Sequence, residues 1–347
     1  MRGRLTIAEI REQPEVLSRL LDVERTSVIR LARDLRRRRP SAVFLAARGT
    51  SDNAALYGHY LFETVLGIPS GLASPSVVTI YRKVPRLRGT LVLGLSQSGR
   101  SSDIVRYLEA ARAAGARTVA ITNDGRSPLA RAAHDSLLLH AGVERSVAAT
   151  KTYTAQLTLL SLLVAAMAGD RRLLRDHDRL PRLVERALRE EDAVRRLSLR
   201  LSRVQRCIIT ARGYNFATAR EAALKLKETA HVAAEALSSA DLLHGPIAVV
   251  GPRFPIIMVA PPGAPRPHLV RVARRLAAQE ARIVVVSSGG GFDDVPHSLV
   301  RTPGKIAEIL TPHVYIVPLQ LLAFHLALAR GFDPDRPRGL RKVTRSL

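Results

Sequence analysis

The stretch AVFLAARGTS at residues 42–51 is repeated later in the chain, in altered form, as RCIITARGYN at residues 206–215. Each copy is a short apolar run that ends in Ala-Arg-Gly, and the two glycines, Gly49 and Gly213, are 164 residues apart. Short runs rich in Val, Ile and Leu are typical of strands that are buried on both faces of a parallel sheet. The repeat therefore predicts two similar lobes, each built around a parallel sheet.

Four further segments repeat in the same order and at nearly the same spacing. They are TLVLGLSQSG and FPIIMVAPPG, RTVAITNDG and ARIVVVSSGG, HDSLLLHAG and HSLVRTPG, and the apolar stretches 154–169 and 317–331. Five elements in one order at a nearly constant offset indicate an internal duplication. We expect one lobe at 41–170 and the other at 205–331.

Helical patterns lie between the apolar runs, as in SSDIVRYLEAARAAGA (101–116) and HLVRVARRLAAQEA (268–281). Strands that alternate with helices form right-handed βαβ units, so the fold class is α/β with doubly wound parallel sheets. Such sheets bind ligands beyond the carboxyl ends of their strands. Outside the lobes we expect an N-terminal helical segment (1–40), a charged helical connector (171–204) and a C-terminal tail (332–347).

The formal net charge of +24 comes almost entirely from arginine, since only six of the 54 basic residues are lysines. The run Arg36–Arg39 could form a nucleic-acid patch, but a solvated helix end with cations near its C-terminal dipole is favoured. Aromatic residues make up only 4% of the chain, and none is tryptophan, which is a poor supply of stacking surfaces for single-stranded nucleic acid. We therefore expect no nucleic-acid partner.

The sequence also argues against disulfides, membrane spans and metal sites. A single cysteine, Cys207, excludes an internal disulfide framework. The N-terminus MRGRLTIAEIREQPEV has charges where a signal peptide needs an apolar core, and the stretch 154–169 is shorter than the roughly 20 residues of a membrane span. The ten histidines are scattered without a metal-binding pattern. We expect a soluble, cytoplasmic protein with no metal, no cofactor and no membrane partner.

Two turns of the first lobe have the composition of a phosphate site. Residues 49–51 (Gly-Thr-Ser) and 96–102 (Ser-Gln-Ser-Gly-Arg-Ser-Ser) each follow a predicted strand and open a predicted helix. Hydroxyl groups and free N–H groups at a helix N-terminus bind phosphate well, although Ser and Thr are also common helix caps. The corresponding turns of the second lobe, at 214–215 and 261–263, lack this chemistry, so the first lobe is the better phosphate holder.

The second lobe supplies titratable groups instead. The segment REAALKLKETAHVAAEA (220–236) has a helical pattern that places Glu221, Lys225 and Glu228 on one face of a helix that begins at the ligand-binding edge of the sheet. A solvent-exposed Glu–Lys pair is the alternative. His244 lies in LLHGP, in an expected loop, and a core or capping role is the alternative there.

Several motifs together resemble the sugar-isomerase (SIS) family. They are GTS (49–51), SQSGRSSD (96–103), VAATKTYTAQL (147–157), EAALKLKETAH (221–231), LLHGP (242–246), VPLQLLAFHLAL (317–328) and DRPRGLRKV (335–343). The sequence is most similar to the isomerase half of glucosamine-6-phosphate synthase and to stand-alone relatives, including the second type of glucosamine-6-phosphate deaminase. The resemblance implies two tandem SIS domains, each a flavodoxin-like αβα sandwich.

The resemblance also assigns roles to single residues. It implies a phosphate loop and neighbouring sugar contacts formed by Ser96, Gln97, Ser98, Ser101, Gly49, Thr50, Ser51 and Val147. It implies that Glu228 moves a proton between C1 and C2 with support from Glu221 and Lys225. It also implies that His244 opens the sugar ring from the other subunit of a homodimer. Lys342 in the tail matches a lysine that forms a Schiff base with the keto sugar.

The sequence departs from the synthase pattern in four places. The glutamine-handling domain has no counterpart in this chain, so we expect a glutamine-independent reaction. Arg100-Ser101 is more similar to the deaminase branch, Ala149 replaces a serine that contacts the sugar, and Arg341 replaces a small residue before Lys342.

These features lead us to expect an enzyme that converts glucosamine 6-phosphate to fructose 6-phosphate and ammonia. An aldose–ketose isomerase, or a deglycase or aminotransferase-like enzyme for a related sugar phosphate, is the first alternative. A non-catalytic sugar-phosphate sensor is the second, and a nucleic-acid binder driven by the arginines is the third.

Overall fold

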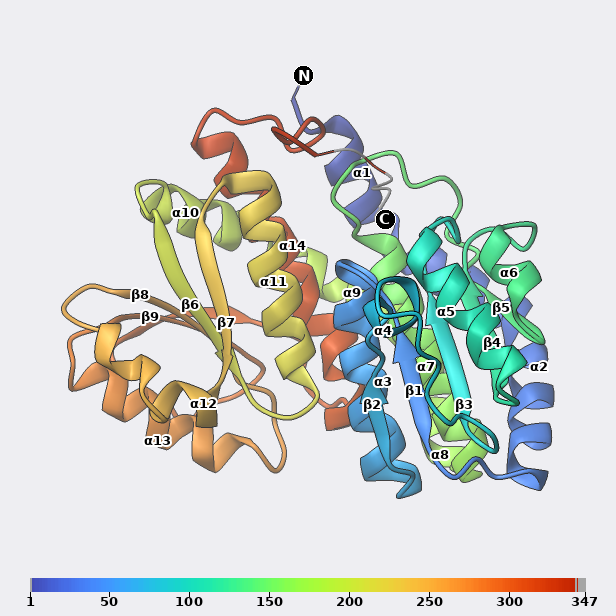
Figure 1. The fold of residues 1–347 in the computed structure, drawn as a ribbon. Coiled ribbons are helices and arrows are strands. Elements are labelled where there is room, and N and C mark those ends of the chain that lie inside the picture. Colours follow the sequence, from blue (N-terminus) through green and yellow to red (C-terminus); the bar gives the residue numbers. More distant parts are fainter. Residues whose placement is uncertain (1, 341, 343–347) are drawn as a thin grey trace. The chain divides into compact units, whose positions relative to one another are not determined.

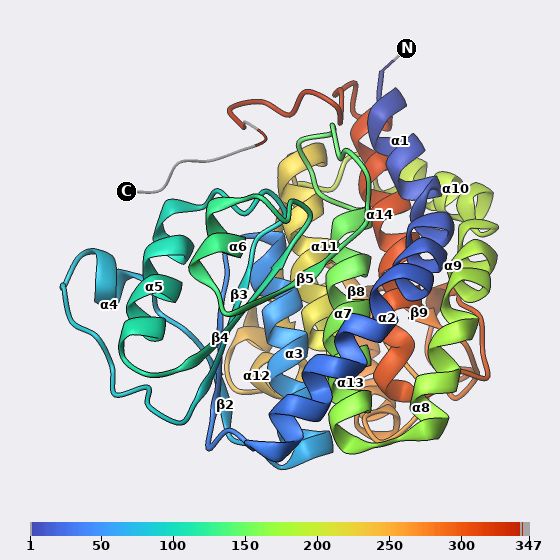
Figure 2. The same cartoon turned by 90° about the vertical axis from the view of Figure 1, so that its right-hand side faces the viewer.

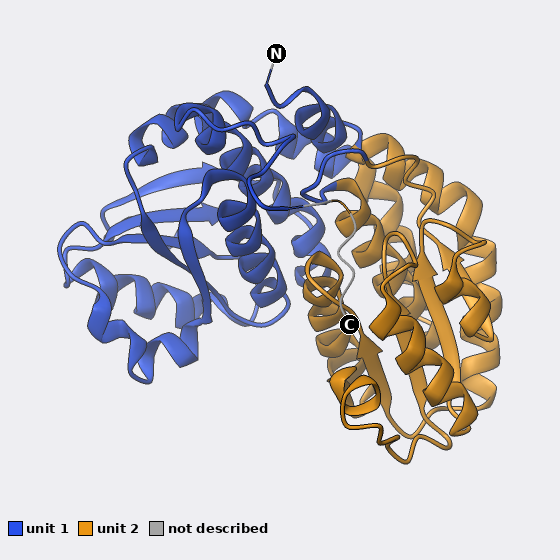
Figure 3. Cartoon of the chain, turned by 45° about the horizontal axis from the view of Figure 1, so that its top comes forward, with its two compact units in different colours: residues 1–12, 145–150, 182–340 blue, residues 13–144, 151–181, 341–347 orange. Residues whose placement is uncertain are grey.

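The computed structural model describes residues 2–340 and residue 342. The chain divides into two compact units, which Figure 3 colours separately. Unit 1 consists of residues 1–12, 145–150 and 182–340, and unit 2 of residues 13–144, 151–181 and 341–347. Each unit is built around one sheet of five parallel strands, as the duplication predicts.

The sheet of unit 2 has the strand order β2-β1-β3-β4-β5. Its strands are β1 (Val43–Ala46), β2 (Ser70–Leu72), β3 (Leu91–Leu95), β4 (Arg117–Thr122) and β5 (Asp135–Leu138). Its helices are α2 (Gln13–Arg37), α3 (Thr50–Leu66), α4 (Ser76–Thr79), α5 (Ser102–Ala113), α6 (Pro128–Ala132), α7 (Lys151–Ala168), α8 (Arg171–Asp176) and the 3₁₀ turn η1 (His177–Arg179). The helix α9 (Leu180–Leu188) crosses the boundary between the units.

Helices cover both faces of this sheet, as Figure 2 shows. Alternate strand residues point to opposite faces, so Ala46, Val92 and Ala120 form one core with α5 and α6. Leu45 points the other way and lies against α3, which packs on α7. Burial on both faces explains why the central strands are continuous apolar runs.

The sheet of unit 1 has the strand order β10-β9-β8-β6-β7. Its strands are β6 (Arg206–Ala211), β7 (Ala233–Ser238), β8 (Pro255–Val259), β9 (Arg282–Ser287) and β10 (His297–Arg301). Its helical elements are α1 (Arg4–Arg11), α10 (Glu191–Leu201), α11 (Asn215–Ala230), α12 (Ser239–Leu243), η2 (Pro246–Val249), α13 (Arg266–Ala277), η3 (Glu308–Leu310) and α14 (Thr311–Ala329), and Figure 1 labels most of them.

The two sheets have the same topology, which confirms the internal duplication. Taken from the opposite edge, the strand order of unit 1 is β7-β6-β8-β9-β10. This is the strand order of unit 2 with five added to each strand number. The helical interpretation of residues 220–236 is wrong beyond Ala230, because His231 adopts the left-handed conformation (φ 52°) and ends α11. Residues 233–238 then form the edge strand β7.

The apolar helices lie inside the fold. The expected buried helix at 154–169 is α7, which is buried from Lys151 to Met167. Among the described residues, one helical segment, Glu308–Ala329, is long and apolar enough to cross a membrane. Because 89% of its most apolar window is buried in the structure, it has the surroundings of a core helix.

The buried thiol of Cys207 on β6 provides a test of this fold. Burial raises the pKa of the thiol to about 12, and only the thiolate is a good nucleophile. We expect iodoacetamide at pH 8 to leave Cys207 unmodified in the native protein and to modify it fully in denaturant, as measured by mass spectrometry. Rapid modification without denaturant would contradict the placement of residues 206–211 in a central strand.

Candidate functional site

The turns at 49–51 and 96–101 lie at the same edge of the unit 2 sheet. They follow β1 and β3, which are adjacent and parallel, so both turns lie at the carboxyl edge. Gly49 has a positive φ of 54° and precedes α3, which begins at Thr50. Ser51 is buried, and its Oγ accepts a hydrogen bond of 2.9 Å from Nε2 of Gln156.

Hydroxyl groups shape the turn that follows β3. Ser96 Oγ accepts a hydrogen bond from the N–H of Gly99 (3.2 Å), and Ser98 Oγ accepts one from the N–H of Arg100 (3.3 Å). Gly99 has a φ of 62°, and a Cβ at this position would lie 2.2 Å from Ser127 Oγ. Only glycine fits this turn without strain.

The side chain of the serine at the start of α5 does not cap the helix. Ser101 is the N-cap residue, yet its side chain makes no hydrogen bond to the N–H groups of the first turn. Its Oγ lies 3.3 Å from Ser96 Oγ. The Arg100 side chain is 66% exposed and lies 3.9 Å from Asp124, so its charge faces solvent. An anion here would meet hydroxyl groups and the N-terminus of α5.

An ion pair that the sequence analysis missed connects the two turns. Arg48 Nε donates a hydrogen bond of 2.8 Å to Oδ2 of Asp103, whose side chain is only 2% exposed. Arg48 follows β1 and Asp103 lies in the first turn of α5, so the pair ties both turns together. The repeated Ala-Arg-Gly motif contains Arg48 and was the available signal.

The described part of the tail places Lys342 in unit 2, beside a buried carboxylate. Lys342 Nζ lies 2.8 Å from Oε2 of Glu144, which is fully buried. Thr152 donates to the same carboxylate through its N–H (3.2 Å) and its Oγ1 (2.8 Å). Sequence reasoning missed Glu144, because a pairing between residues 198 positions apart leaves no local pattern. Arg341 lies outside the described residues.

Val147 and Ala149 are half-buried in the segment 145–150, which belongs to unit 1. The carboxylate of Glu9 on α1 is 4% exposed and accepts hydrogen bonds from the N–H groups of Arg145 and Ser146. The N-terminal helix therefore fixes the start of this segment.

A buried lysine stands between two carboxylates on α11. Lys225 is 2% exposed, and its Nζ lies 2.6 Å from Oε2 of Glu228 and 3.4 Å from Oε1 of Glu221. Glu221 is fully buried, whereas the Glu228 side chain is 22% exposed. The exposed Glu–Lys pair considered as an alternative is therefore wrong. The arrangement leaves Glu228 as the carboxylate that a ligand can reach.

Glu228 lies far along α11 from the start of the helix. The helix begins at the carboxyl edge of its sheet, but Glu228 is 13 residues after Asn215. At a rise of 1.5 Å per residue this is roughly 20 Å from the helix start. Glu228 is therefore near the amino edge, where β7 begins, and not at the ligand-binding edge of its own sheet.

His244 lies at the other edge of unit 1. It follows α12, which comes after the carboxyl end of β7. Its side chain is exposed and has no hydrogen-bond partner within the described ranges. Unit 1 by itself does not bring His244 to Glu228, and the expected contribution from a second subunit stays a prediction.

In unit 1 a carboxylate of the protein occupies the edge that corresponds to the phosphate loop. Glu308 Oε2 accepts a hydrogen bond of 2.9 Å from the N–H of Ala264. A Cβ on Gly263 would lie 2.0 Å from this oxygen, and one on Gly213 would lie 3.9 Å from Oε1. These glycines correspond to Gly99 and Gly49 in the repeat. The corresponding position in unit 1 is therefore occupied by the side chain of Glu308.

Residues 2–340 and 342 contain no group of three or more His, Cys, Asp or Glu side chains that could hold a metal ion.

The ion pairs of Lys225 predict a large effect on stability. We expect Lys225→Met to lower the free energy of unfolding by about 3–5 kcal/mol, because two carboxylates then lose their buried cation. Urea unfolding at pH 7 measures this change. Lys227→Met on the same helix is the matched control, since Lys227 is exposed, and should change the value by less than about 0.5 kcal/mol. Equal effects of the two substitutions would contradict the buried geometry.

Glu308 predicts a pH dependence. Burial raises the pKa of its carboxyl above the ordinary value of 4.5, and the N–H of Ala264 opposes this only in part. The folded protein therefore binds this proton more tightly than the unfolded chain, and the resulting stability is lost as the pH rises through the folded-state pKa. We expect the unfolding free energy of Glu308→Gln, relative to that of the unmodified protein, to increase as the pH rises above 4.5. Parallel pH profiles from urea unfolding would refute the assignment.

Comparison with known proteins places these features in a family. The model of the SIS domain matches residues 37–166 and 200–330, one match for each sheet. The glutamine–fructose-6-phosphate aminotransferase (isomerizing) of Methanothermobacter thermautotrophicus is 37% identical over 302 residues, which is 86% of this chain and 51% of that protein. The chain spans about half the length of the curated relatives it matches.

Solved structures have the same fold over nearly the whole chain. A candidate phosphosugar isomerase from Silicibacter pomeroyi is 36% identical, with a TM-score of 0.87 over 96% of this chain and 100% of that chain. A glucosamine-6-phosphate deaminase from Thermotoga maritima, at 23% identity, has a TM-score of 0.80 over 98% of this chain and 99% of that chain, which shows a shared fold. With both of its sheets matched by the family model, the chain belongs to the SIS domain family.

Proposed function

We propose that this chain is a sugar-phosphate isomerase that converts glucosamine 6-phosphate and water to fructose 6-phosphate and ammonia. The observation that carries the proposal is the Lys225 cluster, in which a buried ammonium fixes Glu228 while leaving its carboxylate accessible. An aldose–ketose shift needs one such base, positioned to serve two adjacent carbons. The names of the family relatives, which include isomerases and an amino-sugar phosphate deaminase, support the substrate class.

The residues divide the chemistry between them. The hydroxyl groups of Ser96, Ser98 and Ser101 hold the phosphate, and this binding energy orients the distant reacting end of the sugar. After ring opening, which we assign to His244, Glu228 removes the proton from C2 and returns it to C1. The 2-amino aldose thereby becomes a 2-imine of the ketose. Water then adds to C2, and the nitrogen leaves as ammonia.

Lys342 has the chemistry of a carbonyl-binding amine. Its ammonium group donates a hydrogen bond to the buried carboxylate of Glu144, which holds the Lys342 side chain in place. In the deaminating direction the keto sugar is the product, and a lysine that forms a Schiff base with it would retain the open-chain form. Arg100-Ser101 after Gly99 also supports the deaminase reading, because the synthase pattern differs at these positions.

The proposed base predicts a specific loss of activity. We expect the purified protein to release ammonia and fructose 6-phosphate from glucosamine 6-phosphate in equal amounts, as measured by coupled assays. Glu228→Gln should lower kcat by about 10²–10⁴-fold, because the amide cannot accept the proton. Lys227→Gln, on the exposed face of the same helix, should leave kcat within about twofold, as expected for a surface change away from the site.

The same assay separates the alternatives. Interconversion of glucose 6-phosphate and fructose 6-phosphate without ammonia release would replace the deaminase with a plain isomerase. Saturable sugar-phosphate binding with no turnover of any substrate would favour a sensor. A mixture of Glu228→Gln and His244→Ala chains tests the proposed homodimer, because activity returns only if the two residues serve one site from different subunits.

A further inference from the structure

Unit 2 has a hollow of about 300 Å³ at the amino edge of its sheet, away from the turns at 49–51 and 96–101. Several of its residues come directly before the strands β3, β4 and β5, and Pro40 lies three residues before β1. It is lined by Asp34, Leu35, Arg38, Pro40, Gly89, Thr90, Gly115, Ala116, Arg117 and His134. The volume is at the lower end of the range for small-molecule sites.

Arg117 presents a buried donor with nothing to bind. Its Nη2 forms ion pairs with Oδ2 of Asp135 (2.6 Å) and Oδ2 of Asp34 (3.4 Å), and Asp135 Oδ2 is buried without a hydrogen-bond partner among the described residues. Its Nε is buried and has no hydrogen-bond partner among the described residues. A buried N–H without an acceptor costs free energy, and an acceptor brought by a ligand would recover it.

His134 presents a second donor, and its tautomer follows from its neighbour. The backbone N–H of Thr118 donates to Nδ1 of His134 (3.2 Å), so Nδ1 carries no proton. Burial lowers the pKa of His134, the charges of Arg112 and Arg117 lower it further, and the charge of Asp135 opposes these effects only in part. The neutral ring therefore carries its proton on Nε2, for which the described residues provide no acceptor.

Arg38 supplies a positive charge to the hollow. It belongs to the run Arg36–Arg39 at the end of α2, and the structure separates the roles of its members. Arg36 packs beside Gly169, and Arg39 donates to the carbonyl oxygen of Leu66. Arg38 lines the hollow, and within the described chain no acidic side chain pairs with it. Arg37 is exposed and takes no part in the hollow.

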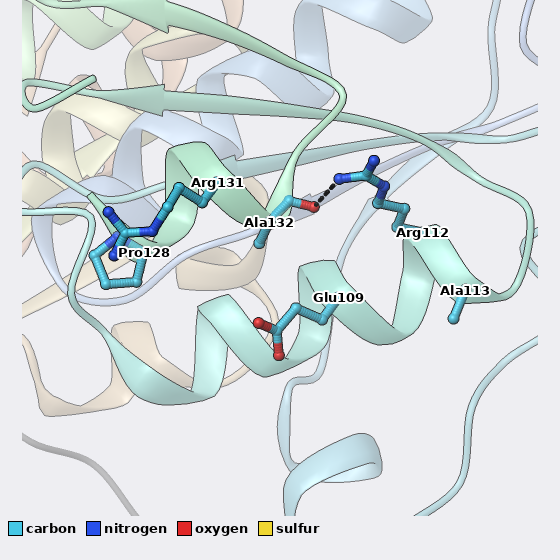
Figure 4. A pocket seen from close by; sticks show the side chains of 6 residues that line it. All are labelled: Glu109, Arg112, Ala113, Pro128, Arg131 and Ala132. Atoms are coloured by element: carbon cyan, nitrogen blue, oxygen red, sulfur yellow. Dashed lines mark hydrogen bonds between the residues drawn. The ribbon is translucent and has the colours of Figure 1, made fainter. Parts of the chain in front are cut away.

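A second hollow of unit 2 lacks these properties. It measures about 580 Å³ and lies between α5 and α6, lined by two arginines and Glu109 (Figure 4). Its Arg112 donates to the carbonyl oxygens of Ala132 (3.5 Å) and Ala133 (3.2 Å), and its Arg131 donates to Arg126. These guanidinium groups are held by backbone oxygens, whereas those of the smaller hollow retain donors.

We propose that the hollow of Arg38, Arg117 and His134 is a binding site for a small organic oxyanion, held through its carboxylate or phosphate group. Two guanidinium groups and an imidazole N–H form a donor set that matches the several acceptor oxygens of such a group. The site is independent of the proposed reaction, since none of its residues belongs to the phosphate loop or to the Lys225 cluster.

Titration calorimetry with citrate and with inorganic phosphate, in separate runs, tests the site. We expect Arg38→Ala, and Arg117→Lys, to weaken binding of at least one of these ions by about tenfold or more, the worth of one charge-assisted hydrogen bond. Arg117→Lys keeps the charge beside Asp34 and Asp135 but removes the buried Nε–H. Arg37→Ala is the matched control and should bind as the unmodified protein does.

Three results would overturn the proposal. They are the absence of saturable binding, equal weakening by Arg37→Ala and Arg38→Ala, and loss of binding in Ser96→Ala/Ser98→Ala with Arg38→Ala unaffected. The second would mean general charge attraction, and the third would assign the ion to the phosphate loop. Thermal unfolding of each variant shows whether it is folded, and Arg38→Gln replaces Arg38→Ala if the latter is not.

Discussion

The strands of both sheets are all parallel and their central members are buried on both faces, and the other features of the molecule follow from this constraint. Parallel strands cannot be joined by tight turns, so a helix must return the chain along the sheet after nearly every strand. Each such connection leaves a turn and a helix N-terminus at the carboxyl edge. The turns at 49–51 and 96–101 are products of this topology before they are parts of a site.

The duplicated fold gave the chain two such edges, and the two have diverged. In unit 2 the turn after β3 presents serine hydroxyls around Gly99, with Arg48 and Asp103 holding the neighbouring turn. In unit 1 the corresponding turn lies against the carboxylate of Glu308. The edge in unit 2 thus presents hydroxyl groups, whereas the edge in unit 1 holds a carboxylate of the protein itself. A second phosphate in unit 1 would meet a negative charge and no hydroxyl cluster.

The strands that could be predicted from the sequence are those that are buried on both faces. The central strands β1, β3, β6 and β8 are largely apolar, apart from Arg206 and Thr210 in β6, and their burial on both faces leaves a clear pattern. The edge strands β2 and β7 were not predicted, because each is covered on fewer sides and reads as a mixture of polar and apolar residues. The helical pattern of α11 continued past Ala230, and only the backbone of His231 reveals its end.

The candidate site was predictable only where it is local. The hydroxyl turns and the face shared by Glu221, Lys225 and Glu228 follow from short spacings. Short spacings do not show whether a side chain is buried. In the structure Glu221, Lys225 and Glu228 form a buried ion cluster and not a solvent-exposed pair. Contacts between distant segments, such as Glu144 with Lys342, depend on the whole fold and have no counterpart in any local window.

At the buried positions, the use of lysine in place of arginine has a physical explanation. Lys225 and Lys151 are each 2% exposed, and Lys151 Nζ donates to the carbonyl oxygen of Val143 (2.9 Å). Lys342 pairs with a fully buried carboxylate. An ammonium is a compact point charge, whereas a guanidinium needs a planar space and several acceptors. Three of the six lysines, Lys151, Lys225 and Lys342, thus place a compact cation against oxygen atoms of the protein, and two of them pair with carboxylates.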